Sequence, residues 1–149
     1  MNRVRGYGIL AGSLLLAGGL WLFARSHVYA TTTAVPAYVV QLADQVAVSN
    51  GDPTPTLAYA IRTTRGPAES VATGGDSVDS PEAPVYLVVM YGHFTTNQAP
   101  TPNGEVLTGS VVTFTVNTQT QQMMDGSIGN YSPSLASLES LGPLESFTP

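Results

Sequence analysis

The stretch from Val85 to Phe94 constrains the fold of this chain more than any other. It reads Val-Tyr-Leu-Val-Val-Met-Tyr-Gly-His-Phe, and the residues before the glycine are apolar or aromatic without interruption. Its length and its many β-branched and aromatic residues favour a strand buried on both faces over a helix. Gly92 near its end predicts a bulge or a close approach of another part of the chain. The remaining residues must therefore cover this strand.

Composition and charge exclude several classes of function. The 149 residues include no cysteine, so neither a disulfide framework nor a thiolate metal site is available. There is also no lysine, and from Thr31 onward two arginines stand against ten carboxylates, a net charge of −8. Such an acidic chain repels phosphate backbones. We therefore expect no nucleic-acid partner.

Residues 1–30 read as a signal peptide or a transmembrane anchor. Arg3 and Arg5 precede residues 7–24, which carry no charge and are long enough to span a membrane if they are not cleaved. Small residues up to Ala30 suit cleavage by a signal peptidase. Both alternatives place the N-terminus inside and the remainder outside the cytoplasmic membrane, as a single-pass membrane protein or as a secreted one. The extracytoplasmic part then consists of a linker, 31–35, and a single domain, 36–149.

The start of this domain predicts one amphipathic helix. Pro36 suits a first helical turn, and Asn50 followed by Gly51 suits a helix end in which glycine adopts the left-handed conformation. Between them, apolar residues recur at spacings of four, three and four, which places them on one helical face: Val35, Val39, Leu42 and Val46.

Four strands are expected to form an antiparallel sheet against this helix. Residues 57–64 alternate with a period of two, although a helix from Pro55 is the alternative. The strand 85–94 follows a polar loop, 66–83, that holds at most one helical turn. A hairpin then joins the last two strands, 112–117 and 123–128, and Thr113 lies on the solvent face of the first. A short C-terminal helix is expected to carry three leucines that seal the core: Leu135, Leu138 and Leu141.

This α+β order of elements resembles that of PepSY domains and, more loosely, of cystatin-like folds. The resemblance covers residues 39–130 and is carried by the helix end 48–52, the strand 85–94 and the pair 111–128. The strand, with Thr108 and Gly109, also resembles small exported bacterial proteins of unassigned function. The second hairpin departs from the usual Asp-Thr-Gly turn, since it reads Asn-Thr-Gln-Thr-Gln here. The resemblance implies a module that binds or modulates peptides or peptidases; it transfers no catalytic residue.

Few residues suggest chemistry. His93 is the only histidine outside the N-terminal segment, so no histidine cluster can bind zinc, and no G-x-S-x-G nucleophile motif is present. We expect no catalytic residue, cofactor or metal. Arg62 and Arg65 either offset neighbouring carboxylates or grip an anion, and the sequence favours the first role. His93 is expected to pack at the end of its strand. The weak candidates for a binding site are His93, Tyr91, Arg62 and Arg65.

Three classes of function agree with these features. The favoured one is a non-enzymatic exported or membrane-anchored module that binds a peptide or protein through its sheet face or an edge strand. The second is a small extracytoplasmic hydrolase, which requires titratable groups that are buried and close together. The third is a structural envelope protein with no ligand. Convergence of His93, Asp125 and Arg62 with a loop carboxylate on one concave surface would favour the hydrolase.

Overall fold

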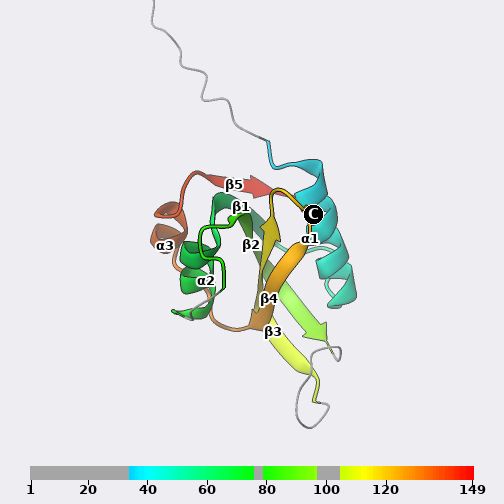
Figure 1. Ribbon diagram of the computed structural model, residues 1–149. Helices are drawn as coiled ribbons and strands as arrows, with labels where there is room; N and C mark the ends of the chain where they lie inside the picture. The colour runs from blue at the N-terminus through cyan, green and yellow to red at the C-terminus, as the bar shows by residue number, and fades with distance from the viewer. Residues whose placement is uncertain (1–33, 76–78, 97–104) are drawn as a thin grey trace, which may run out of the picture. The chain divides into compact units, whose positions relative to one another are not determined.

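The computed structural model describes residues 34–75, 79–96 and 105–149 (Figure 1). The strands form one antiparallel sheet in the order β4-β3-β2-β1-β5. The expected α+β class is therefore confirmed, with five strands in place of four. The expected signal peptide or anchor lies outside the described residues. The elements are, in chain order, α1 (Ala37–Ser49), β1 (Leu57–Thr64), α2 (Arg65–Thr73), β2 (Pro84–Thr96), β3 (Leu107–Asn117), β4 (Met123–Gly129), α3 (Leu135–Glu139) and β5 (Leu144–Phe147).

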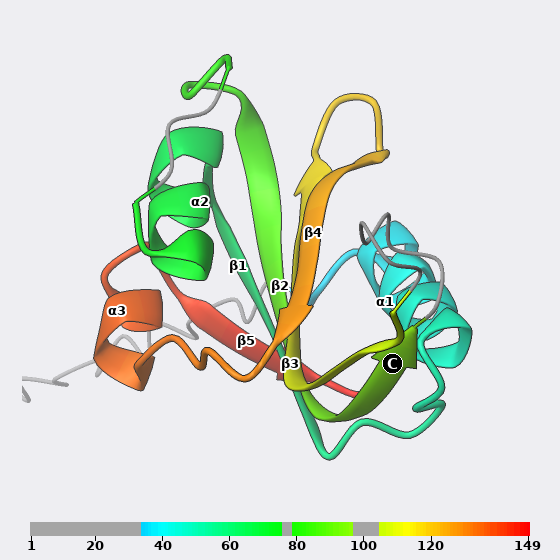
Figure 2. The same ribbon diagram turned by 90° about the horizontal axis from the view of Figure 1, so that it is seen from below.

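The expected burial of β2 on both faces is confirmed. Val88 and Val89 point to opposite faces of the sheet, and neither is accessible to solvent. Val88, Met90 and Phe94 belong to a cluster that includes α1, whereas Val89 belongs to a cluster that includes α2 and α3. Figure 2 shows α1 on one side of the strands and α2 and α3 on the other. The sheet is thus the middle layer of three.

Helix α1 covers the first face through small side chains. Val39, Ala43 and Ala47 are fully buried, whereas Leu42 is only half-buried at the margin of the contact. The alanines let the helix backbone approach the sheet closely. The helix ends as predicted: Gly51 has φ of +79°, and the Asp52 amide donates to the Ala47 carbonyl at 3.0 Å.

The second face differs from the sequence-based expectation. Thr113 was expected to face solvent but is 4% exposed, and Thr115 is fully buried. The segment expected to be a loop with one helical turn forms the nine-residue helix α2, which packs on this face through Ala68 and Ala72. Gly66 and Pro67 concealed this helix because both residues usually interrupt one. Here they lie in its first turn, where proline is tolerated.

A bulge in β2 and a short fifth strand also position the rest of the fold. The predicted bulge in β2 is confirmed, since Gly92 and His93 together lie opposite Ser110. A Cβ at Gly92 would meet the Asp52 carboxylate at 2.1 Å, so the predicted close approach is confirmed too. The second feature was missed: the short strand β5 pairs with β1, although its Glu and Ser residues hide any strand pattern.

No helix in the described ranges is long and apolar enough to cross a membrane. The segment 7–24, for which a membrane span is an alternative, lies outside those ranges.

The helices on the second face predict a contrast between two leucines of α3. Leu138 is fully buried and Leu135 is 52% exposed. Leu138→Ala should lower the free energy of unfolding by about 2–5 kcal/mol because it leaves a cavity beneath the helix. Leu135→Ala, the matched control, should change it by less than about 1 kcal/mol. Urea unfolding curves measure both. Equal losses at the two positions would mean that α3 does not cover the core.

Candidate functional site

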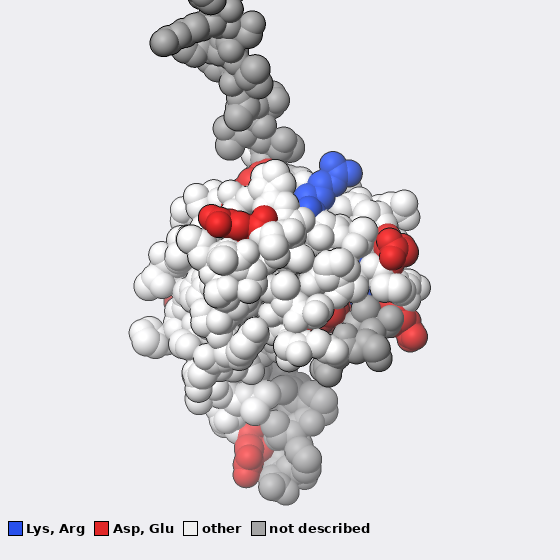
Figure 3. Space-filling view, turned by 90° about the vertical axis from the view of Figure 1, so that its left-hand side faces the viewer, with Lys and Arg blue, Asp and Glu red and all other residues white. Residues whose placement is uncertain are grey.

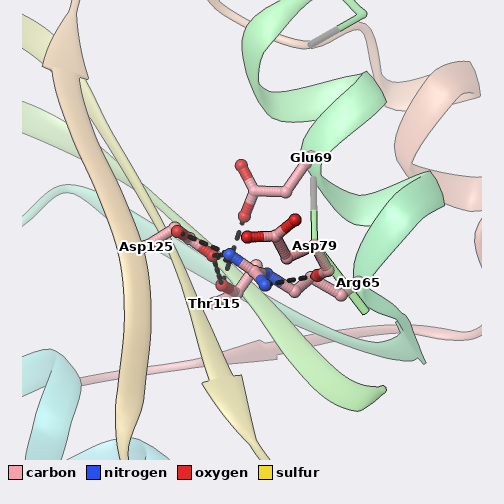
Figure 4. A network of polar contacts seen from close by, with 5 residues as sticks. All are labelled: Arg65, Glu69, Asp79, Thr115 and Asp125. Carbon is pink, nitrogen blue, oxygen red and sulfur yellow. Dashed lines mark hydrogen bonds and ion pairs between the residues drawn. The ribbon is translucent and has the colours of Figure 1, made fainter. Parts of the chain in front are cut away.

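A cluster of charged and hydroxyl side chains lies between α2 and the strands β3 and β4 (Figure 4). Arg65 and Glu69 share one face of α2 because they are four residues apart. Thr115 comes from β3 and Asp125 from β4. Met124 and Asp125 together lie opposite Thr115, so β4 carries a bulge at this point. A bulge changes the direction of the strand's side chains, and this one accompanies the contact of Asp125 with α2.

Arg65 joins three segments of the chain. Its Nε donates to Asp125 Oδ2 at 2.8 Å, and its Nη2 donates to Asp125 Oδ1 at 2.9 Å, which makes the pair bidentate. Its Nη1 donates to the backbone carbonyl of Asp79. The side chains are 14% exposed for Arg65 and 34% for Asp125. The guanidinium is therefore already engaged, and the role that the sequence favoured, neutralising a carboxylate, is the role observed.

Glu69 is the buried acid of this cluster. It is 6% exposed, and its Oε1 accepts a hydrogen bond of 3.2 Å from the Thr115 hydroxyl. That hydroxyl also lies 3.3 Å from Asp125 Oδ2, and with a single proton it can donate to only one of the two carboxylates at a time. Burial, and secondly the negative charge of Asp125, raise the pKa of Glu69. Arg65 lowers this pKa, but not by enough to offset both causes.

Two clefts border β4. The first, about 330 Å³, adjoins the charged cluster, and its lining includes Glu69, Asp125 and the hydroxyl groups of Thr113 and Ser127, which lie 2.8 Å apart. The second, about 550 Å³, lies between β4 and the C-terminal half of α1. Half of its lining residues are apolar: Val46, Leu107, Val112, Phe114, Met123 and Ile128. Thr113, Phe114, Gly126 and Ser127 line both clefts. A polar cleft and an apolar cleft thus open beside the same strand.

Of the binding residues predicted from sequence, only Arg65 belongs to this cluster. Tyr91 is half-buried and packs edge-to-face on Tyr59, with ring centroids 6.3 Å apart. Arg62 is exposed on β1. His93 is exposed in the β2 bulge, where its backbone amide donates to Asp52 Oδ2 at 2.7 Å. The expectation that His93 packs at the strand end is therefore wrong.

Neither Glu69 nor Thr115 was predicted from the sequence as a site residue. One signal was available for Glu69, namely its spacing of four residues from Arg65, but that spacing matters only once α2 is recognised as a helix. Thr115 lies two residues after Thr113 and so shares the strand face for which the sequence predicts exposure to solvent. Asp125 was considered only as one of several groups that might converge.

The arrangement suits binding better than bond cleavage. Thr115 is fully buried, so its hydroxyl has no access to a substrate despite its contact with Glu69. Within the described ranges no three His, Asp or Glu side chains are grouped to hold a metal ion. Arg65 is hydrogen-bonded to Asp125, so Glu69 is the carboxyl group that the cluster leaves for a cation at the polar cleft.

Comparison of the chain with protein-family models, with curated proteins and with solved structures finds no match. The resemblance to PepSY domains therefore stays a prediction.

The buried acid predicts a pH dependence of stability. Because its pKa is raised in the folded state, Glu69 keeps its proton to a higher pH there than in the unfolded chain. The corresponding stabilisation is complete below the usual glutamate pKa and is lost as the pH rises through the raised one. Glu69→Gln should remove this loss and be at least as stable as the wild type at neutral pH. Urea unfolding across a pH series measures the effect.

The matched control for this experiment is Glu139→Gln, since Glu139 is exposed on α3. It should leave the pH profile of stability unchanged. If Glu69→Gln followed the wild-type pH profile of stability, Glu69 would not be the acid that causes the pH dependence.

Proposed function

We propose that this chain is an exported or membrane-anchored binding module, without enzymatic activity of its own, that takes an extended peptide along β4 outside the cytoplasmic membrane. The observation that carries the proposal is the free edge of β4. This strand has seven residues, ends the strand order of the sheet and, among the residues that the structure describes, pairs with β3 alone. Its outward peptide groups are available to hydrogen-bond with the backbone of another segment.

The β4 edge lacks most of the features that normally prevent such pairing. Free edges are commonly protected by proline, by lysine, by uncompensated charge, by a β-bulge or by short length, and of these β4 has the bulge. β4 has no proline or lysine, and its one charged residue, Asp125, is paired with Arg65. Met123 and Met124 are 50% and 37% exposed and offer adaptable apolar contacts. The bulge confines regular pairing to the residues that follow it, 126–129.

The opposite edge of the sheet differs in the clefts beside it. β5 has four residues, as many as β4 offers for regular pairing, so backbone hydrogen bonds do not separate the two edges. Clefts of about 280 and 440 Å³ border β5, whereas β4 borders the charged cluster and the cleft of about 550 Å³. Backbone pairing supplies affinity in this mode of recognition, and clefts for alternate side chains supply specificity. Both requirements coincide at β4.

The second candidate function is a small hydrolase. One observation favours it: Glu69, with its raised pKa, lies near Asp125 at the border of a cleft, and perturbed acids concentrate at catalytic sites. Against it, His93 and Arg62 lie away from this cluster, and the hydroxyl beside Glu69 is inaccessible. The export component of the proposal is supported by the two arginines that precede an uncharged apolar segment.

Strand addition predicts a specific response to peptide N-methylation. Seven-residue peptides, matching β4 in length, would be selected from a random library on the full chain in detergent. In a paired strand, alternate amides face the receptor. Methylation of one alternate set should abolish binding, and methylation of the other set should leave it. Amide shifts in NMR spectra should move at 126–129 and not at 144–147. Equal tolerance of both sets would contradict the proposal.

The proposed location predicts that protease added to intact cells, with any wall removed, digests the domain. N-terminal sequencing of the purified protein distinguishes the two variants of the proposal. A start at Thr31 identifies a cleaved signal, and retention of residues 1–24 identifies an anchor. Complete protection from protease would contradict the location in either form.

A further inference from the structure

The position of the two clefts determines what a strand beside β4 would meet. Side chains of a strand alternate between the two faces of its sheet, and an added strand continues the faces of its neighbour. On β4, Ile128 packs with the α1 cluster, whereas the Ser127 hydroxyl meets Thr113 on the α2 side. Successive side chains of a bound peptide would therefore enter the apolar cleft and the polar cleft in turn.

The cleft on the α1 side requires apolar side chains. Its inner wall includes Val112 and Phe114, which are buried, and its outer part includes Leu107 and Met123, which are partly exposed. Among the described residues that line it, none is charged. A charged peptide side chain would lose its hydration there without gaining a partner.

The cleft on the α2 side requires a cation. Glu69 and Asp125 lie at this cleft, and the guanidinium of Arg65 is hydrogen-bonded to Asp125. The hydroxyl groups of Thr113 and Ser127 add acceptors at the same cleft. An ammonium or guanidinium group could donate to the Glu69 carboxylate and to a hydroxyl oxygen, and its positive charge would favour the ionised form of Glu69.

The net charge of the chain also favours a basic peptide. From Thr31 onward the net charge is −8, with only two arginines. Figure 3 shows one face of the molecule, on which red acidic side chains are spread and a single blue basic one projects. Such a field attracts basic peptides and slows the approach of acidic ones.

We infer that the peptide bound along β4 is one in which basic and apolar residues alternate, with a lysine or arginine in the cleft beside Glu69 and apolar residues in the cleft beside α1. This inference rests on the proposed function. A second copy of this chain is a poorer occupant because the only charged residue of β4 is Asp125. Self-pairing would bring a second Asp125 to the edge and would bring no lysine or arginine to the polar cleft.

The test compares synthetic seven-residue peptides on the full chain in detergent, with affinities measured by calorimetry. The probe alternates lysine and valine. Three peptides serve as comparisons: one with the same residues in two blocks, one alternating threonine and valine, and one alternating glutamate and valine. The lysine–valine alternation should bind about tenfold more tightly than the block peptide and the threonine–valine peptide, and the glutamate peptide should not bind.

A variant pair identifies the residue responsible. Glu69→Gln should weaken the lysine–valine peptide about tenfold and the threonine–valine peptide by less than about threefold, and its urea unfolding curve shows that the variant is folded. Glu139→Gln, an exposed carboxylate on α3, should change neither affinity. If Glu69→Gln does not fold, the wild-type comparison of peptides decides alone.

The failures of the two proposals are distinguishable. Threonine–valine and lysine–valine peptides that bind equally well would overturn the inference and leave strand addition intact. If no alternating peptide bound while library-selected peptides of another pattern did, the inference alone would also fail. If no extended peptide bound at all, the proposed function and the inference would fall together. Concentration-dependent dimerisation through β4, seen by ultracentrifugation, would replace the peptide by a second copy.

Discussion

The rest of the structure depends on the burial of β2 from both sides. Antiparallel sheets commonly leave one face to solvent, and their strands then alternate between apolar and polar residues. Residues 85–90 do not alternate, and all of them are buried. Each face therefore needs its own cover: α1 on one side, α2 and α3 on the other. The small side chains of Ala43, Ala47, Ala68 and Ala72 let these short helices lie close to the sheet.

Local signals in the sequence predicted the elements that have local causes. The end of α1 followed from Asn50 and Gly51, and the bulge in β2 followed from Gly92. The elements that were missed depend on tertiary contacts. Gly66 is the second residue of helix α2, and a Cβ there would come within 2.9 Å of Pro81, a contact that cannot be read from the sequence. Strand β5 has only four residues and gains its order from pairing with β1.

Less of the candidate site than of the fold could be predicted from the sequence. The sequence favoured a role for Arg65 in offsetting a neighbouring carboxylate, and the structure shows this role. Which carboxylate it pairs with could not be predicted. The pairing depends on a bulge in β4 that brings Asp125 to the face of α2, and bulges of this kind have no reliable sequence signature when no glycine marks them. Glu69 was missed because burial of a carboxylate is decided by the surrounding elements. The same contacts tie α2, the segment at Asp79 and β4 together, so this cluster contributes to structure as well as to the charge of the cleft.

The position of β5 has a consequence for the order in which the chain can fold. β1 is an inner strand of the finished sheet, yet one of its two partners consists of residues 144–147, almost at the C-terminus. A chain that emerges N-terminus first keeps that side of β1 unpaired until residues 144–147 have emerged too. Pairing between such distant residues also carries a high entropic cost of loop closure and slows folding. Under the proposed export, the sheet would stay incomplete until β5 had crossed the membrane, which would disfavour folding before that point.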